Sequence, residues 1–348
     1  MTDDGLRERG ARAGGAVPRG RGLEVAADGS ASRRAATTGT GGLLGGPARP
    51  AFTLTRLDPA PELVDVVERH WVVRWSLPPG VRVVQSLLPH ACVNLVAERV
   101  PGAAGTGPTV LFAAHTMPAG RYDRVLEGTG TAFGTKFRPG GAEAFARAVH
   151  GARAAAQLGL TRPGRVVPAV HLLRPGADTL GRTALEAVEA GDVAGAVATV
   201  TEALTELQWW AERSSWQAHR ARPPVWSGDR VLARVHEVFA AVVSGRLGPQ
   251  ARVEDLAEVA GMSVRSLQRL LRERVGVSPK WVLQRHRVQL AAELIETRPD
   301  RDLGEVAVEA GYYDQSHLTA DFSALVGLTP GLYARRCAQA REAVSADA

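Results

Sequence analysis

The pattern of apolar and polar positions divides the chain into short apolar runs followed by a long helical segment. Over residues 52–141, β-branched and apolar runs alternate with glycine and proline, which is typical of short strands joined by turns. The runs are Val81–Leu88, Ala91–Ala97, Val110–Ala114, Tyr122–Leu126 and Thr131–Phe137, after a stretch, Pro61–Trp75, that fits a short helix or a strand. We therefore expect a small β-rich unit here.

From Ala142 onward, apolar residues recur every three or four positions, the spacing of one face of an α-helix. Helices are predicted over Ala142–Val149, Asp178–Ala190 and Val193–Trp210. The sequence Arg222-Pro223-Pro224 then interrupts the pattern, so residues 221–228 are predicted to be a linker.

Residues 1–50 differ from the rest because they contain 12 glycines and almost no apolar periodicity. Such a segment buries too little surface to offset the entropy of ordering, so we expect it to be disordered. The whole pattern predicts an α+β protein. We expect a first domain over 51–220, β-rich over 52–141 and helical over 142–220. An all-α domain spans 229–340, and 341–348 form a tail.

The strongest helical signal follows the linker. One apolar stripe runs along a first helix, and two further helices, 253–260 and Val264–Arg274, flank the sequence Gly261-Met262-Ser263. Glycine adopts the positive φ that a tight turn requires, and Ser263 suits a helix N-cap. Ala257, four residues before Gly261, is small enough for a close helix approach. This is the helix-turn-helix arrangement, whose second helix enters the major groove of DNA.

The arrangement occurs a second time. Ala307 again stands four residues before a glycine, Gly311, and Gln315–Leu325 is a second candidate recognition helix. Between the two units, Pro279–Glu296 predicts a helix about 27 Å long, at about 1.5 Å per residue. Successive major-groove faces lie about 34 Å apart. A rigid helix of this length can therefore hold both recognition helices on one face of a duplex.

Local charge favours a nucleic-acid partner for this domain. Seven basic residues stand against one acid, Glu273, in the stretch from Ser263 to Arg287: Arg265, Arg269, Arg272, Arg274, Lys280, Arg285 and Arg287. Such a cluster neutralises phosphates and releases counterions. A solvated helical face is the more frequent explanation of a charge run, but the repeated turn favours DNA binding. The formal net charge of +6 adds little, because an arginine-rich composition with only two lysines also fits biased coding.

Composition and cysteine content exclude several other classes. The two cysteines, Cys92 and Cys337, are too few for a disulfide-dense scaffold or a four-cysteine zinc module. No stretch is long and apolar enough to span a bilayer, and no apolar run with a cleavage site follows the N-terminus. We therefore expect a cytoplasmic protein without a membrane partner.

The C-terminal residues resemble the DNA-binding domain of the AraC family of bacterial transcription regulators. The matching stretches are LAEVAGMSVRSLQRLLRERVGVSPKWVLQRHRVQLAAELI and VAVEAGYYDQSHLTADFSALVGLTPGLYARR, together about a third of the chain. A G-[VL]-[ST]-P element follows each unit, at Gly276–Pro279 and Gly327–Pro330. In the N-terminal region, RHWVVRW, LLPHACVNLV and FGTKFRPGGAEAF are similar to the sensory-type domain of one AraC-like subgroup.

The resemblance implies which residues contact DNA. In the first recognition helix, Arg265, Gln268 and Arg269 would read bases, with Ser263 and Arg272 beside them. Arginine can bond guanine O6 and N7 together, and glutamine can pair with adenine N6 and N7.

In the second helix, the implied contacts are Gln315, Ser316, His317 and Thr319. His317 could touch phosphate or simply be a surface histidine. Ala320 stands where some relatives carry a basic residue, with Asp321 beside it, so we expect this unit to dock mostly on the DNA backbone.

Three further candidates have plainer explanations. His70, His90, Cys92 and His115 could meet and bind a metal, with His90 and Cys92 on one face of a strand, but no ligand spacing supports this. The stretch GTKFRPGG could bind an anion through Lys136 and Arg138, although a turn is the favoured interpretation. Trp209 and Trp210 could line a pocket, although packing is favoured.

The sequence therefore predicts a transcriptional regulator that binds double-stranded DNA. Its N-terminal domain would sense a small-molecule effector or a partner, or mediate homodimer formation, and an activator would also contact RNA polymerase. We expect no cofactor, metal or catalytic residue. Two alternatives stay open: an AraC-like domain fused to an enzymatic or DNA-repair module, and a DNA-independent interaction protein. Against the first alternative, this sequence lacks the cysteine cluster that a methyl-accepting repair module needs.

Overall fold

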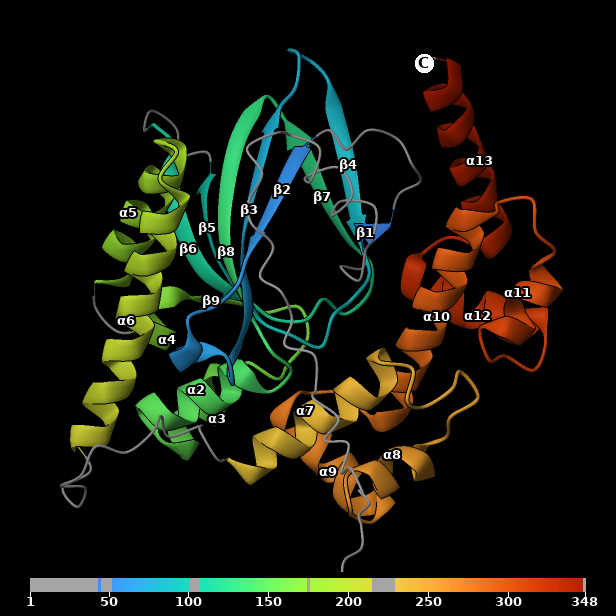
Figure 1. Ribbon diagram of the computed structural model, residues 1–348. Helices are drawn as coiled ribbons and strands as arrows, with labels where there is room; N and C mark the ends of the chain where they lie inside the picture. The colour runs from blue at the N-terminus through green and yellow to red at the C-terminus, as the bar shows by residue number, and fades with distance from the viewer. Residues whose placement is uncertain (1–42, 45–51, 101–106, 174–175, 215–228, 347–348) are drawn as a thin grey trace, which may run out of the picture.

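The protein is described by a computed structural model that covers residues 43–44, 52–100, 107–173, 176–214 and 229–346. Over these residues the predicted α+β architecture is confirmed: a β-rich domain with helices on one side precedes an all-helical domain (Figure 1). The predicted linker, 221–228, lies outside the described residues, as does most of the predicted N-terminal tail.

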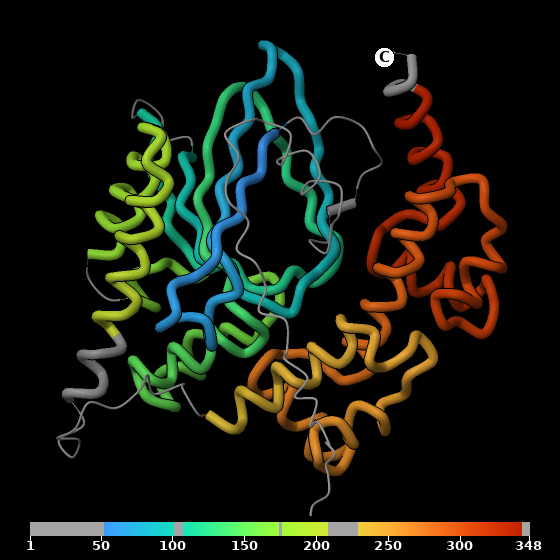
Figure 2. Tube along the Cα trace, in the orientation of Figure 1, coloured from blue at the N-terminus to red at the C-terminus, as the bar shows by residue number. Residues whose placement is uncertain are grey.

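Two antiparallel sheets form the N-terminal domain. The larger has the strand order β2-β3-β8-β5-β6-β9, and the smaller has the order β1-β4-β7. The strands are β1 (Leu43–Leu44), β2 (Phe52–Leu57), β3 (Val67–Ser76), β4 (Arg82–Leu87), β5 (Asn94–Val100), β6 (Thr109–His115), β7 (Tyr122–Glu127), β8 (Thr129–Phe137) and β9 (Val166–Pro168). The smaller sheet faces the larger one across the interior of the domain (Figure 2).

The helices of this domain are α2 (Gly141–His150), α3 (Ala152–Leu158), α4 (Ala169–Leu173), α5 (Ala177–Glu189) and α6 (Val193–Ser214). Helices α4, α5 and α6 lie on the opposite side of the larger sheet, and α2 and α3 lie at the end of the domain near α7 (Arg230–Val243) (Figure 1). Helix α5 approaches the sheet closely because Gly181 faces Phe112, where a Cβ atom would lie 2.4 Å from the ring.

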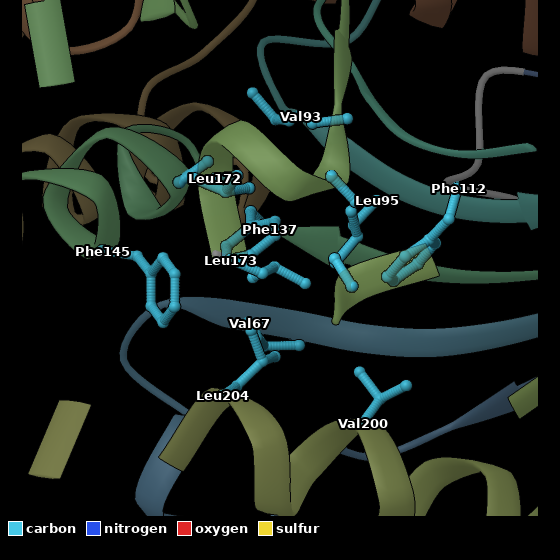
Figure 3. Packing of buried hydrophobic residues seen from close by; sticks show 14 of the residues in the cluster. Val67, Val93, Leu95, Phe112, Phe137, Phe145, Leu172, Leu173, Val200 and Leu204 are labelled. Atoms are coloured by element: carbon cyan, nitrogen blue, oxygen red, sulfur yellow. The ribbon is translucent and has the colours of Figure 1, made fainter. Parts of the chain in front are cut away.

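The core of this domain lies between the sheet and the helices. Phe112, Phe137 and Phe145 are buried there with Leu95 and Leu204 (Figure 3). Burial of such apolar side chains contributes roughly 1.5–3 kcal/mol each. One face of β3 supplies Val72 and His70 to this core, so its alternate residues face the smaller sheet.

The C-terminal domain is entirely helical. Its helices are α7 (Arg230–Val243), α8 (Val253–Val259), α9 (Val264–Arg274), α10 (Pro279–Thr297), α11 (Leu303–Glu309), α12 (Gln315–Val326) and α13 (Pro330–Ala346). One buried cluster lies around α7 to α9 and the start of α10, and a second around α10 to α13. Helix α10 thus belongs to both, and α9 and α12 lie toward its opposite ends (Figure 1).

Four details of the sequence prediction need correction. The stretch Pro61–Trp75 contains both a 3-10 turn, η1 (Pro61–Leu63), and strand β3, because its apolar spacing changes within it. Within the segment expected to be disordered, Leu43–Leu44 pair with β4, whose outer edge offers unpaired backbone groups. Strand β9 falls in the region expected to be helical, as an edge strand on β6. The expected tail continues helix α13 to Ala346.

Candidate nucleic-acid interface

The two helix-turn-helix corners have the same backbone geometry. Gly261 has a φ of 60° and Gly311 a φ of 87°, both in the left-handed region that glycine tolerates. The amide of Met262 donates to the Ala257 carbonyl at 3.0 Å, and the amide of Tyr312 donates to the Ala307 carbonyl at 2.8 Å. The predicted repeat of the turn is therefore confirmed at the level of hydrogen bonds.

Helix α9 separates its side chains into a buried and an exposed face. Leu267 and Leu271 are fully buried against the neighbouring helices, which fixes the orientation of the helix about its axis. The predicted contact residues lie on the other face, and all of them are exposed: Ser263, Arg265, Gln268, Arg269 and Arg272. The Ser263 hydroxyl accepts a hydrogen bond from the Ser266 amide at 3.2 Å, so this serine also caps the helix.

Helix α12 presents a second, less basic surface. Gln315, Ser316 and His317 are exposed at its first turn, whereas Thr319 is half-buried. Asp314 caps the helix through the His317 amide at 2.8 Å and also pairs with the His317 ring at 3.1 Å. The His317 ring therefore lies beside the helix N-terminus.

The carboxylate of Asp321 is directed toward the protein. It accepts a hydrogen bond from Gln284 of α10 at 2.7 Å and is half-buried. Its negative charge is thus held against α10, and it fixes α12 to the central helix.

Only some of the seven basic residues between Ser263 and Arg287 are available to a partner in the folded protein. Arg285 donates to the Pro89 carbonyl at 2.5 Å, and Arg287 donates to the carbonyls of Pro249 and Ala251. Arg274 donates to Glu143 at 2.7 Å. The prediction that these three arginines offer charge to phosphates was wrong, because each has its guanidinium bonded to protein oxygen atoms. Arg265, Arg269, Arg272 and Lys280 remain exposed.

The two units are held together by a contact at the middle of the domain. A Cβ atom on Gly311 would lie 2.2 Å from the Pro249 carbonyl oxygen, so the second corner is pressed against the loop between α7 and α8. Arg287 of α10 donates to the same carbonyl at 2.8 Å. The relative placement of the two units therefore depends on direct contact as well as on α10.

The other candidates are resolved by their contacts. His90 and Cys92 lie in the loop between β4 and β5, so the expectation that they share a strand face was wrong. Among the described residues, no group of three or more His, Cys, Asp or Glu is placed to hold a metal. Lys136 pairs with Glu68, and Arg138 donates to the Val64 carbonyl, consistent with a structural turn at GTKFRPGG. The side chains of Trp209 and Trp210 lie outside the described residues.

Sequence reasoning missed the contacts between the two domains. Arg274, the last residue of α9, donates to Glu143 of α2, and burial raises the pKa of that carboxyl although Arg274 and Arg147 act to lower it. Leu88 packs into the cluster of the second unit, and Ala91 into that of the first. The loop 88–93 therefore lies against both helix-turn-helix units. The only sequence signal was its apolar character between two strands.

Sequence reasoning also missed a cavity between the two sheets of the N-terminal domain. Arg69, Trp71, Val73 and Trp75 alternate along β3 and line a space of about 290 Å³. Along β3 these large side chains alternate with residues that face the core. The alternation could have indicated that the second face of the strand is also covered by protein.

Comparison with known proteins matches two parts of the chain. A family model described as a helix-turn-helix domain matches residues 256–336, and a domain of unknown function (DUF6597) matches residues 55–152. The RCS-specific HTH-type transcriptional activator RclR of Escherichia coli is 33% identical over 108 residues, which is 30% of this chain and 38% of that protein. The match thus spans well under half of that relative's length.

Solved structures give weaker likenesses. A probable AraC family transcriptional regulator from Rhodopseudomonas palustris is 20% identical, with a TM-score of 0.28, over 30% of this chain and 97% of that one. ToxT from Vibrio cholerae is 9% identical, with a TM-score of 0.34, over 82% of this chain and 97% of that one. In the described part of this chain, no helix has the length and apolarity needed to cross a membrane.

Proposed function

We propose that this chain, whose C-terminal third is a helix-turn-helix domain of the AraC type, regulates transcription by binding double-stranded DNA. In this proposal residues 229–340 bind DNA, residues 221–228 link the domains, and residues 51–220 sense an effector or mediate homodimer formation. The protein would act in the cytoplasm, where DNA and RNA polymerase are present. An activator would in addition contact RNA polymerase.

The observation that carries the proposal is the exposed face of α9. Arg265, Gln268 and Arg269 project from a helix whose opposite face is locked by Leu267 and Leu271. A helix fixed in this way can enter a major groove without reorganising, and its arginine and glutamine side chains can make paired hydrogen bonds to base edges. Arg272 and Lys280, which are also exposed, would neutralise phosphates.

We assign the second unit mainly to the DNA backbone. Gln315, Ser316 and Thr319 lie in the first half of α12, and they are uncharged side chains that can donate hydrogen bonds to phosphate oxygens. His317 beside them would add a donor to phosphate. Sequence would then be read mostly through α9, and α12 would set the register.

The test is a binding-site selection with the full-length protein and a random duplex library, followed by electrophoretic shifts on the selected site. Arg269→Ala should lose about 1–3 kcal/mol of discrimination, roughly a 5- to 150-fold drop on the selected site, with little change on unrelated DNA. Arg272→Ala should weaken binding to both and lower the salt dependence.

Arg82→Ala is the matched control, because Arg82 is an exposed arginine on β4, 66% exposed, in the other domain. It should leave binding unchanged. Failure of the folded wild-type protein to enrich any site would refute the proposal. An equal effect of Arg82→Ala and Arg269→Ala would refute the assignment of α9 as the reading helix.

A further inference from the structure

The cavity between the two sheets is bounded by strands of both. Residues from β2, β3, β5, β6 and β8 of the larger sheet line it on one side, and residues from β4 and β7 line it on the other. Its volume of about 290 Å³ is close to the lower end of the range of small-molecule sites, which starts near 300 Å³. It lies on the face of the larger sheet away from the helical layer, so it is separate from the hydrophobic core.

Two tryptophans form a fixed aromatic wall of this cavity. A Cβ atom on Gly134 would lie 2.2 Å from the Trp71 ring, and one on Gly130 would lie 2.1 Å from the Trp75 ring. The indoles therefore lie directly over the glycines of β8. The Trp71 ring nitrogen donates to Asn94 at 3.2 Å and that of Trp75 to the Glu127 carbonyl, so hydrogen bonds hold both rings in place.

Strand register places charge at one end of the cavity. Arg69 pairs with Lys136, Lys136 pairs with Asn94, and Asn94 pairs with His115, so these four residues form one row across β3, β8, β5 and β6. Arg56 stands one row further along, opposite Trp71. All five line the cavity.

The opposite end is mostly apolar. The row of Leu54, Val73 and Ala132 comes next, followed by Phe52 and Trp75. Glu98 belongs to the first of these rows, but its carboxylate is paired with Arg124 of β7. The cavity therefore has a polar, basic end and an apolar, aromatic end.

The basic end of the cavity brings together three cationic side chains, Arg56, Arg69 and Lys136. Glu68 is shared between Arg69 and Lys136, with Lys136 at 2.8 Å, so one carboxylate serves two cations. Burial is the main cause that lowers the pKa of Arg56, and the nearby charge of Arg69 adds to it while Glu68 acts in the opposite direction. The His115 Nε2 atom is buried without a hydrogen-bond partner among the described residues. An anion with acceptor oxygens could accept hydrogen bonds from the three cations, and a second polar group of the ligand could reach the His115 nitrogen further along the row.

We propose that the cavity binds an organic acid with a flat apolar body, its carboxylate held between Arg56, Arg69 and Lys136 and its body against Trp71 and Trp75. This rests on the proposed function, for which it names the chemical class of the effector.

The basic end adjoins the loop that contacts the DNA-binding domain. Asn94 of the basic row follows the loop 88–93 directly, and His90 of that loop lines the cavity. Leu88 of the same loop packs into the second unit, while the Pro89 carbonyl accepts from Arg285 of α10. A carboxylate bound in the cavity therefore lies next to the segment that packs against both units, and its binding would change the DNA affinity.

The test is isothermal titration of the full-length protein with 2-naphthylacetate and with 2-naphthylethanol, which has the same ring but no charge. The acid should bind about tenfold or more tightly than the alcohol, the value of a hydrogen-bonded charge. Arg56→Gln and Lys136→Gln should each remove most of this preference while leaving the alcohol's affinity within about twofold. Gly134→Ala should weaken both probes, because the new methyl group displaces the Trp71 ring into the cavity.

Arg82→Gln, on the exposed edge outside the cavity, is the matched control and should behave as the wild type. Equal affinities of acid and alcohol, or the same loss with Arg82→Gln as with Lys136→Gln, would overturn the proposal. Absence of binding by both probes to a protein that still selects a DNA site would overturn it and leave the proposed function standing. If the acid binds but the protein selects no DNA site, the proposed function is overturned and the binding of the acid in the cavity stands.

Coupling is tested by fluorescence anisotropy on the selected DNA site. Saturating acid should change the DNA affinity of the wild type and leave that of Lys136→Gln unchanged. An unchanged affinity in the wild type would refute the link through the loop 88–93.

Discussion

Gly276 connects the end of α9 to the N-terminal domain, and its replacement by alanine should weaken that contact. It has a φ of 88°, and a Cβ atom there would lie 1.8 Å from the carbonyl oxygen of Thr161, in the loop after α3. Gly261 provides a matched control because its φ is 60° and no atom lies within 4 Å of its would-be Cβ atom. The two substitutions therefore share the backbone penalty and differ in the contact.

The magnitude follows from these two contributions. A positive φ costs an alanine roughly 1–2 kcal/mol, so Gly261→Ala should lower the free energy of unfolding by about that much. In Gly276→Ala the Thr161 carbonyl must also move from 1.8 Å to beyond the 3.0 Å below which real contacts essentially never fall. Crowding of this kind in packed protein costs roughly 1–3 kcal/mol, for a total of about 2–5 kcal/mol.

The assay is thermal unfolding of both full-length variants. Each kcal/mol corresponds to roughly 1–2 °C in Tm for a chain of this length, so the additional cost of about 1–3 kcal/mol should make Gly276→Ala melt about 1–6 °C below Gly261→Ala. Proteolysis of Gly276→Ala should also expose sites at the domain boundary first. Equal Tm values for the two variants would show that the contact with Thr161 does not exist in solution, and would refute the described docking of the domains.

Three further outcomes concern single side chains. Burial lowers the pKa of His70 to about 4 from 6.5. The unfolded chain therefore binds a proton that the folded chain does not, and the free energy of unfolding should fall by up to about 3 kcal/mol between pH 6.5 and pH 4. In urea denaturation across this pH range, His70→Gln should make the free energy of unfolding depend less steeply on pH. An unchanged pH dependence would contradict the lowered pKa of His70. Ser263→Ala removes the cap on the Ser266 amide and should cost about 1 kcal/mol in urea denaturation, where no change would mean that the cap is not formed. Phe322→Ala empties a fully buried position beside Tyr333 and should cost about 3–5 kcal/mol by the same measurement, so that a loss below about 1 kcal/mol would argue against that core.

Local sequence was sufficient for several helices of the C-terminal domain. The apolar period and the glycine at each corner act over one or two helical turns, so they predicted α8, α9 and α12 to within one residue at each end. The same holds for the exposed positions of α9, because a helix with Leu267 and Leu271 inward must turn Arg265, Gln268 and Arg269 outward.

In the N-terminal domain, short strands were predictable from their composition, but their partners were not. The order of the larger sheet brings β3 beside β8 and β8 beside β5, pairings between segments far apart in the chain. Only this order places Arg69, Lys136 and Asn94 in one row and so creates a basic end of the cavity.

Local sequence was enough to locate the helices on either side of each glycine corner and to show which face of α9 is polar, because these properties depend on neighbours within a few residues. The tertiary structure decided which charges are available. Arg269 and Arg285 look alike in the sequence, yet Arg269 is exposed while Arg285 is bonded to the Pro89 carbonyl. The physical reason is that a guanidinium loses its water to whichever oxygen atoms the packing of distant segments brings within about 3 Å, and no local pattern encodes that distance.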